Sequence, residues 1–379
     1  MTKVETFLAT KPLYYTTFDP LRIQEAYASI RHALVVPPIV HIIGTNGKGT
    51  TGRFLAQLLG QQHLKVGHYT SPHIHRMHER IAIDGEPIDD AALTAAFERL
   101  NALLSPRWQE ALSYFEYTTL LAMVAFEGCD WVVLEAGLGG EYDATSVFDN
   151  RLTVVTPIGM DHEAFLGDTL EAIATTKINA VKRFALLGLQ ERVVYDTLIG
   201  VLDAKHIPYV VTAAILDEAV EALSLPSYLK ENMQLALTAA RIVGFEHFDV
   251  KALKVLEGRF MQLGERVIVD VGHNVLAAKR LTQNLSKERK VILLYNSYLD
   301  KDFEAILTHF VPYVVRVEIV PIEDARIVPR ATLEESLERL GIPHAPFMGL
   351  DTASHYVVFG SFKVAEYFLH YWEQHHQHG

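Results

Sequence analysis

Two spacings of apolar residues run through this chain, and together they predict an α/β fold. Short apolar runs such as 131–135 and 152–156 predict buried strands. Elsewhere apolar residues recur every three or four positions, as Phe54, Leu55 and Leu58 do, which predicts helices. Strands that alternate with helices indicate mostly parallel, doubly wound sheets. We expect strands at 35–40, 64–70, 131–135, 152–156, 184–187, 207–211, 267–271, 291–295, 313–319 and 356–359, and helices at 21–33, 53–60, 89–104, 114–127, 168–181, 228–243 and 362–371.

The alternation runs through the chain twice, which predicts two domains. The first series of strands and helices ends near Leu256, and a second starts near Gly258. We therefore expect a larger domain at 1–257 and a smaller one at 258–379. A short hairpin around Asp84 and Gly85 interrupts the first series. In such sheets, ligands bind beyond the carboxyl ends of the strands, and the unusual polar residues of both halves fall there.

The segment that follows the first strand has the layout of a phosphate-binding loop. It runs Gly44, Thr45, Asn46, Gly47, Lys48, Gly49, Thr50 and Thr51. The glycines permit backbone conformations that place N–H groups around an anion at a helix N-terminus. Lys48 is placed to reach the terminal phosphates, and Thr50 or Thr51 to meet a metal ion. The alternative is an ordinary strand–helix turn, which requires neither the lysine nor the two threonines.

Three further polar residues follow predicted strands of the first half. Ser71 ends the second strand, Glu135 ends a central strand, and His162 follows another; Lys177 lies 15 residues beyond His162, in a helix. Oxygen ligands suit Mg²⁺, especially where substrate phosphates complete its shell. Two of these residues also have a structural alternative: a capped or ion-paired carboxylate for Glu135, and a hydrogen-bonded core histidine for His162.

The second half carries its own polar set at strand ends. Asp270 ends a strand, and His273 and Asn274 open the helix that follows it. Arg259 can neutralise a phosphate with two parallel hydrogen bonds. The structural alternatives are a domain-interface salt bridge for Arg259, helix capping for Asn274 and a plain surface position for Lys301.

Composition narrows the partners and the compartment. The chain has 379 residues, 49% hydrophobic and 21% charged, and a net charge of −12, which disfavours nucleic acid or an anionic membrane as a partner. No apolar run approaches the roughly 20 residues that a membrane span needs. The single cysteine, Cys129, fits a reducing compartment, and residues 1–10 lack a secretory signal, so we expect a cytoplasmic protein.

Taken in order, these residues resemble the folylpolyglutamate synthase/dihydrofolate synthase family, within the Mur-type ATP-dependent amide ligases. Each motif is weak by itself, but the ordered set is specific and spans residues 44 to 362. The motifs are Gly44-Thr-Asn-Gly-Lys-Gly-Thr50, Ser71-Pro-His73, Glu79-Arg80, Tyr114-Phe-Glu-Tyr117, Glu135-x-Gly-Leu-Gly-Gly140, Asp143-Ala-Thr145, Asp161-His162, Lys177, Gly258-Arg-Phe260, Asp270-x-x-His-Asn274, Asp300-Lys-Asp302 and Gly360-Ser-Phe362.

The resemblance implies a fold and a set of site residues. It implies an N-terminal ATP-binding domain and a smaller C-terminal Rossmann-like domain, with the site in the cleft between them. Lys48 and the loop amides would hold ATP, and Ser71, Glu135 and His162 would hold Mg²⁺. Lys177 matches a lysine that is carbamylated in this group. Arg259, Asp270, His273 and Asn274 would bind nucleotide or lie beside glutamate, and His73, Arg80, Tyr114, Asp143 and Lys301 would contact substrate.

The implied reaction is ATP-dependent amide formation on a monomeric enzyme. A substrate carboxylate attacks the γ-phosphate, and the amine of L-glutamate displaces phosphate from the acyl phosphate, with His273 or His162 as the base. The acceptor is dihydropteroate, a reduced folate, or both. A Mur-type ligase for another carboxylate remains an alternative, as do a non-catalytic nucleotide-binding protein and a hydrolytic switch. Glu141, Ser146 and Val275 depart from the family pattern.

Overall fold

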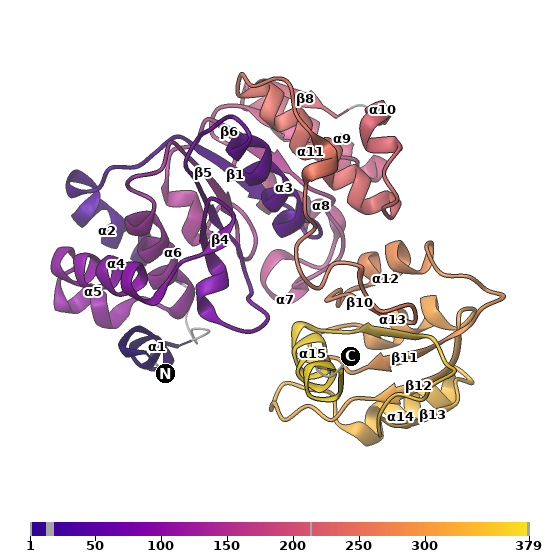
Figure 1. Cartoon of the computed structure of the whole chain (residues 1–379). Coiled ribbons are helices and arrows are strands. Elements are labelled where there is room, and N and C mark those ends of the chain that lie inside the picture. The colour runs from indigo at the N-terminus through magenta and orange to yellow at the C-terminus, as the bar shows by residue number, and fades with distance from the viewer. Residues whose placement is uncertain (1, 13–18, 213, 377–379) are drawn as a thin grey trace. The chain divides into compact units, whose positions relative to one another are not determined.

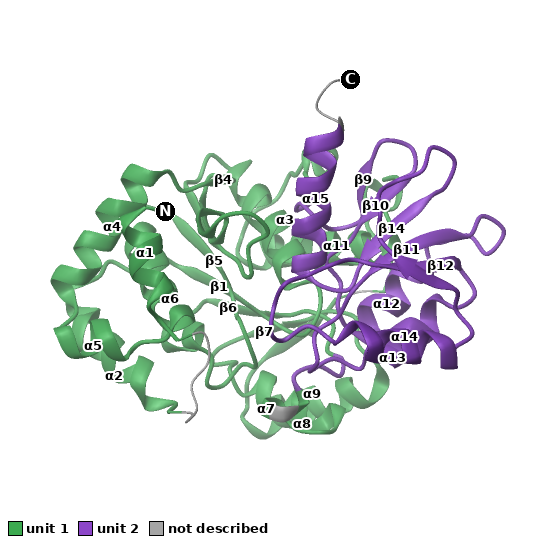
Figure 2. Ribbon diagram, turned by 90° about the horizontal axis from the view of Figure 1, so that it is seen from below, with its two compact units in different colours: residues 1–158, 163–254 green, residues 159–162, 255–379 purple. Residues whose placement is uncertain are grey.

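The computed structural model describes residues 2–12, 19–212 and 214–376, which form two compact units. Unit 1 comprises Met1–Ile158 and Glu163–Lys254, and unit 2 comprises Gly159–His162 and Val255–Gly379 (Figure 2). The four residues 159–162 thus group with the second unit although both of their flanking segments belong to the first. The domain boundary expected between 257 and 258 stays a prediction.

Unit 1 is built on a mostly parallel sheet, as the sequence predicts (Figure 1). Within the described residues its order is β4-β3-β2-β5-β1-β6-β7-β8, and neighbouring strands pair in parallel except for β2 with β3 and β3 with β4. Strands β3 and β4 form the hairpin that was predicted around Asp84 and Gly85. The bounds are β1 (Ile39–Ile43), β2 (Val66–Tyr69), β3 (Ile81–Ile83), β4 (Glu86–Pro87), β5 (Trp131–Glu135), β6 (Leu152–Val155), β7 (Ala185–Leu187) and β8 (Tyr209–Val211).

Helices cover both faces of this sheet because its strands are apolar on both sides. Val132 and Leu134 of β5 belong to one core together with residues of the N-terminal helices, α4 and α6. On the opposite face, α3 packs on β1, β2 and β5, and α11 packs against α3. The helices are α1 (Lys3–Ala9), α2 (Leu21–Ile30), α3 (Lys48–Gly60), α4 (Asp90–Leu103), α5 (Pro106–Ala111), α6 (Tyr114–Ala125), α7 (Glu163–Leu166), α8 (Leu170–Ile178), α9 (Arg192–Ala204), α10 (Glu218–Glu221) and α11 (Ser227–Ile242).

Local capping explains where several of these helices begin. The Asp89 side chain accepts a hydrogen bond from the Ala92 amide and so caps α4. Ser113 and Glu116 form a reciprocal capping box at α6. Arg22 of α2 binds the same Glu116 carboxylate through two nitrogens, at 3.0 and 3.1 Å. This charge pair, largely shielded from solvent, therefore joins α2 to the start of α6.

Unit 2 has a smaller sheet with the order β13-β12-β11-β14-β10-β9, of which only β9 is antiparallel among the described strands. Its core lies between this sheet and helices α12–α14. The bounds are β9 (Met261–Leu263), β10 (Val267–Val269), β11 (Val291–Tyr295), β12 (Val314–Ile319), β13 (His344–Pro346), β14 (Tyr356–Phe359), α12 (Val275–Thr282), α13 (Phe303–Phe310), α14 (Arg330–Arg339) and α15 (Phe362–His376).

Short elements are where the sequence prediction fails. Strands β9 and β13 have three residues each, too few for a periodic pattern to appear. Residues 3–9 form helix α1, capped by Thr2 and Glu5, for which we predicted no element; an irregular segment was expected at 12–20. Residues 13–18 of that segment lie outside the described part. Among the described helices, none is both long and apolar enough to cross a membrane.

Candidate functional site

The loop between β1 and α3 has a backbone that only glycine permits at two points. Gly44 has φ +140°, and a Cβ there would lie 2.1 Å from Thr156 Oγ1. Gly47 has φ +86°, and a Cβ there would lie 2.6 Å from Asn232 Oδ1. The loop is therefore fitted closely against β6 and α11. It leads directly into the N-terminus of α3, where unbonded N–H groups favour an anion.

Two lysine side chains reach this loop from different helices. Lys48 Nζ donates to the carbonyls of Gly44 and Thr45, at 3.3 and 3.1 Å. Lys177 of α8 donates to the same Gly44 carbonyl at 3.0 Å, although it lies 133 residues away in the chain and is only 3% exposed. Two ammonium groups beside a helix N-terminus fit a polyphosphate. Thr50 and Thr51 are buried in the first turn of α3.

Glu135 lies at the same edge of the sheet, at the end of β5. Its Oε2 accepts hydrogen bonds from the hydroxyl of Thr70 and, at 3.1 Å, from the backbone amide of Ser71. Within the described residues, no three His, Cys, Asp or Glu side chains form a group that could hold a metal ion. Carboxylate oxygens such as those of Glu135 are a ligand type that Mg²⁺ takes in proteins, with phosphates and water in the rest of its shell.

His162 belongs to unit 2, whereas Ser71 and Glu135 belong to unit 1. The His162 backbone has φ +54°, which is uncommon for a residue with a side chain, and the side chain is 35% exposed. The alternative of a buried core histidine is therefore wrong. The metal role of the three residues together stays a prediction.

The structure brings together three of the residues predicted to contact substrate. Arg80 Nε donates to His73 Nδ1 at 2.8 Å, and the Arg80 guanidinium lies 5.1 Å from the centre of the Tyr114 ring. Burial raises the pKa of Tyr114, with the Arg80 charge opposing that rise. These residues come from the segment after β2 and from the first turn of α6. They form one continuous cluster within unit 1.

Asp143 is built into the glycine-rich loop that follows β5. Its Oδ1 accepts from the Thr145 amide at 3.0 Å and the Thr145 hydroxyl at 2.6 Å, and its Oδ2 accepts from the Leu138 amide at 2.8 Å. Burial raises the pKa of Asp143, while these hydrogen bonds and the Lys48 charge oppose the rise. The carboxylate therefore fixes the loop and still borders the pocket described next.

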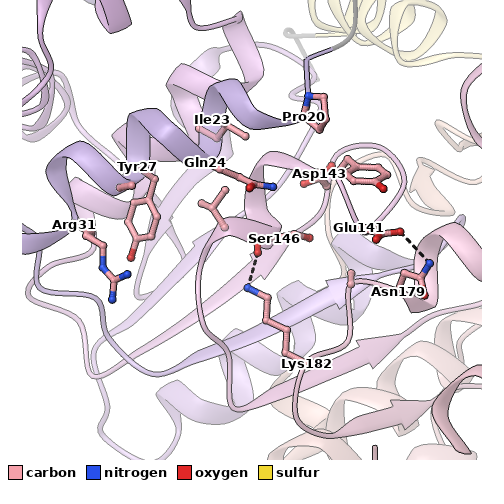
Figure 3. A pocket seen from close by; sticks show the side chains of 14 residues that line it. Pro20, Ile23, Gln24, Tyr27, Arg31, Glu141, Asp143, Ser146, Asn179 and Lys182 are labelled. Carbon is pink, nitrogen blue, oxygen red and sulfur yellow. Dashed lines mark hydrogen bonds between the residues drawn. The ribbon is translucent and has the colours of Figure 1, made fainter. Parts of the chain in front are cut away.

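A pocket of about 430 Å³ lies between α2, residues 141–147 and residues 179–182 (Figure 3). Asp143 and Glu141 line it from the glycine-rich loop, and Tyr27 lines it from α2. Lys182 also lines the pocket, and its ammonium group donates to the Ser146 and Phe148 carbonyls at 2.7 and 3.2 Å. The pocket thus offers carboxylates, aromatic surface and a cation to one small molecule.

Unit 2 has a separate polar centre around Asp161. Lys301 Nζ lies 2.6 Å from Asp161 Oδ1, Asn274 Nδ2 donates to Oδ2 at 3.0 Å, and His273 Nε2 lies 3.8 Å from Oδ2. Burial acts to raise the pKa of Asp161, but the charges of His273, His162 and Lys301 outweigh it and hold that pKa well below its usual value. Lys301 is 9% exposed, so its interpretation as a surface lysine is wrong.

The other unit 2 candidates lie around β10 and the start of α12. Asp270 accepts from the Phe260 and Gly272 amides, at 3.0 and 2.8 Å. The Arg259 guanidinium lies 5.1 Å from the centre of the Phe362 ring, and the His273 ring lies 6.2 Å from the same ring. Asn274 accepts from the Ala277 amide, so its predicted alternative as the cap of α12 is confirmed.

Three contacting residues were missed in the sequence. The Thr70 hydroxyl, as well as the Ser71 amide, donates a hydrogen bond to Glu135. In the sequence, the one indication of this role was the position of Thr70 directly before Ser71. Phe115 lies so close to the glycine-rich loop that a Cβ on Gly137 would come within 2.5 Å of its ring. His41 contacts Thr145 from β1, and as a lone histidine in an apolar strand it gave no signal of function.

Comparisons with known proteins agree with this geometry, although no family model matches the chain. A dihydrofolate synthase/folylpolyglutamate synthase from Escherichia coli is 36% identical over 333 residues, or 80% of this chain and 77% of that protein. The crystal structure of Helicobacter pylori folylpolyglutamate synthetase is 35% identical, with a TM-score of 0.79 and 98% of each chain covered. A bifunctional folylpolyglutamate synthase/dihydrofolate synthase from Yersinia pestis, complexed with AMPPNP and Mn ion, is 25% identical, with a TM-score of 0.84 and 97% of each chain covered.

Sequence identity above 30% over most of both chains, together with the matching two-sheet fold, supports one conclusion. This chain belongs to the dihydrofolate synthase/folylpolyglutamate synthase family.

Proposed function

We propose that this chain is an ATP-dependent ligase that joins L-glutamate to the carboxylate of dihydropteroate and of reduced folates. The acceptor carboxylate attacks the γ-phosphorus of ATP, and the P–O bond to ADP breaks. The glutamate amine then attacks the acyl carbon of the acyl phosphate, loses a proton and displaces inorganic phosphate. The observation that carries this proposal is the phosphate-binding loop with two lysines on the Gly44 carbonyl, in a member of this family.

The protein's share of this reaction is charge neutralisation and positioning. Lys48 and the amides at the start of α3 would hold the triphosphate, and Lys177 would act on the same loop from α8. Magnesium, when bound, supplies positive charge that stabilises the transferring phosphate, and Ser71, Glu135 and His162 are the residues that would hold it. The cation charge matters because the attacking carboxylate and the triphosphate are both anions.

Residues of unit 2 are proposed to bind the nucleotide and to assist the amine. Arg259 would pair with phosphate oxygens, and Asp270 and Asn274 would accept or donate hydrogen bonds to the nucleotide. His273 or His162 would remove the proton from the glutamate amine. Burial lowers the pKa of His273, which favours the neutral imidazole that can accept this proton.

The acceptor is proposed to enter the pocket beside Asp143. A pterin ring presents neighbouring N–H donors, which a carboxylate accepts well. Asp143 uses three acceptor positions within its own loop and keeps one further lone pair on Oδ2 for a ligand. The Arg80, His73 and Tyr114 cluster would contact the acceptor elsewhere in unit 1.

We further propose that the enzyme works as a monomer in the cytoplasm. Every proposed site residue lies on this one chain, so no second copy is needed to supply a missing group. The single cysteine, Cys129, suits a reducing compartment.

The decisive experiment measures phosphate release with ATP, Mg²⁺ and L-glutamate, adding dihydropteroate or tetrahydrofolate in turn. We expect release with each acceptor, and product masses increased by one glutamate. A Lys48→Ala variant is the negative control. Equal phosphate release without any pterin would contradict the ligase proposal, and release with one acceptor alone would limit the substrate range to that compound.

A further inference from the structure

His41 is a buried polar residue that the proposed mechanism does not use. It lies in the middle of β1, is 1% exposed, and directs its ring toward the glycine-rich loop of the neighbouring strand β5. Its Nε2 lies 2.7 Å from the Thr145 hydroxyl. Its Nδ1 is buried and has no hydrogen-bond partner among the described residues.

Hydrogen-bonding chemistry sets the direction of the two bonds that link His41, Thr145 and Asp143. Thr145 Oγ1 lies 2.6 Å from Asp143 Oδ1, and a carboxylate only accepts, so the hydroxyl donates its single proton to Asp143. The hydroxyl can then only accept from His41, which must carry its proton on Nε2. The unpartnered Nδ1 is consistent with this tautomer, because an Nδ1–H would be a buried donor with no acceptor.

The histidine stays neutral over the range in which an enzyme of this kind works. Burial, with a smaller contribution from the Lys182 charge, lowers the pKa of His41 to about 3. The hydrogen-bond chain therefore keeps one fixed direction, from His41 through Thr145 to Asp143. It occupies Oδ1 of Asp143, whereas Oδ2 accepts from the Leu138 amide alone among the described residues and keeps a lone pair for a further donor.

We infer that His41 and Thr145 are positioning residues that hold the Asp143 carboxylate in the orientation that the acceptor's N–H donors require. This inference rests on the proposed function, because it assigns Asp143 to the acceptor. It adds that acceptor affinity depends on a strand residue that never touches the acceptor. His41 lies just ahead of the phosphate-binding loop in the sequence, yet it is assigned to the acceptor site and not to the ATP site.

The test separates acceptor binding from ATP binding and from stability. Thr145→Val removes the hydroxyl at nearly constant volume, and His41→Leu removes the donor. We expect each variant to raise the KM for dihydropteroate about tenfold, the effect of one lost hydrogen bond of roughly 1.4 kcal/mol, with the KM for ATP unchanged. The double variant should be no worse than either single one, because both break the same chain.

Conservative variants and a matched control complete the design. Thr145→Ser and His41→Gln keep a hydroxyl and an N–H donor, so both should restore most of the acceptor affinity. His68→Leu is the control, since His68 is similarly buried in β2, which lies on the other side of β5 from β1, and its Nε2 has no hydrogen-bond partner among the described residues. It should change the melting temperature without changing the KM for dihydropteroate.

A readout that needs no turnover tests the proton arrangement directly. Nitrogen-15 NMR of the histidine-labelled protein should show His41 as a neutral imidazole with its proton on Nε2, and Thr145→Val should shift that Nε2 signal. An Nδ1–H tautomer would overturn the inference, as would a His41→Leu variant with lowered stability but an unchanged acceptor KM. Absence of pterin-dependent phosphate release in the wild-type enzyme would instead overturn the proposed function, and with it the acceptor role.

Discussion

At the scale of single residues, the site depends on charges and hydrogen-bonding groups that have been withdrawn from water. Lys177 is nearly fully buried yet reaches a backbone carbonyl of the phosphate-binding loop. Buried polar groups are costly unless hydrogen-bonded, and they are retained where a specific geometry is needed. Their replacement should therefore affect activity or stability much more than replacement of comparable surface residues.

Lys177→Ala should lower kcat for phosphate release by at least about 10²-fold, because it removes a buried side chain that bonds the phosphate-binding loop. Circular dichroism should show an unchanged fold. Lys205→Ala, which removes an exposed lysine, is the control and should keep normal turnover. Near-normal kcat in Lys177→Ala would remove Lys177 from the catalytic set and end the carbamate hypothesis.

Stability should fall with acidification because two fully buried histidines are neutral in the fold. Burial lowers the pKa of both His41 and His68 to about 3, with the charges of Lys182 and Arg53 adding to the effect. The unfolded chain takes up these protons near pH 6.5, so the stabilisation is complete above that pH and is lost as pH falls toward 3.

Denaturant unfolding of wild type and His68→Leu at several pH values measures this effect. Each histidine should contribute a slope of about 1.4 kcal/mol per pH unit within that window. The variant should therefore lose less stability than wild type between pH 6 and pH 4, values chosen to lie inside the roughly 3–6.5 window. Parallel losses in the two proteins would show that His68 becomes protonated in the folded state.

At the scale of elements, the site is a property of strand ends and helix starts. The loop after β1, Ser71 after β2 and Glu135 at the end of β5 all lie at the carboxyl edge of one parallel sheet. Parallel pairing is what gathers them there, since all strands of that group end on the same side. The N-terminus of α3 completes the set with its unbonded amides.

Gly47→Ala should weaken ATP binding. An alanine at φ +86° costs about 1–2 kcal/mol, and its Cβ would meet Asn232 of α11, so the loop must shift. We expect the KM for ATP to rise at least about tenfold, together with a lower melting temperature. Gly60→Ala, at the other end of α3, is the control, because a Cβ there meets nothing within 4 Å. It should leave the KM for ATP unchanged and slightly raise stability.

At the scale of the whole molecule, the chain leaves unit 1 for four residues and returns to it. Residues 159–162 group with unit 2, and Asp161 is bonded there to Lys301 and Asn274. Lys301 is well buried, and although burial acts to lower its pKa, Asp161 and Asp300 outweigh that and raise it. A buried ion pair therefore fastens this short segment to the second unit.

Asp161→Ala should destabilise unit 2 by roughly 3–5 kcal/mol, because it leaves the Lys301 charge buried without Asp161. Amide hydrogen exchange should show faster exchange for residues 159–162. Combining it with Lys301→Met should recover part of the loss, since both charges are then removed. Arg330→Ala, which breaks an exposed pair with Glu334, should cost at most about 1 kcal/mol. Similar costs for Asp161→Ala and Arg330→Ala would contradict this assignment.

The sequence by itself determined many of the longer elements and the class of chemistry. Apolar periodicity placed β5, β11 and β14 at their observed bounds, because these strands are apolar runs flanked by turn residues. The spacing of glycines, lysine and threonines at 44–51 indicated a phosphate-binding loop, since few other local structures need those residues in that order. The ordered motifs then indicated the family to which the chain belongs.

Only the tertiary structure decided which distant residues touch. Lys177 and Gly44 are 133 positions apart, and Asp161 and Lys301 are 140 apart, so no local pattern predicts either contact. The same holds for His41, whose sequence neighbours are apolar and whose partner Thr145 lies beyond the neighbouring strand. Periodicity reports which face of an element is buried, but the identity of the group across that face depends on how strands are ordered in the sheet.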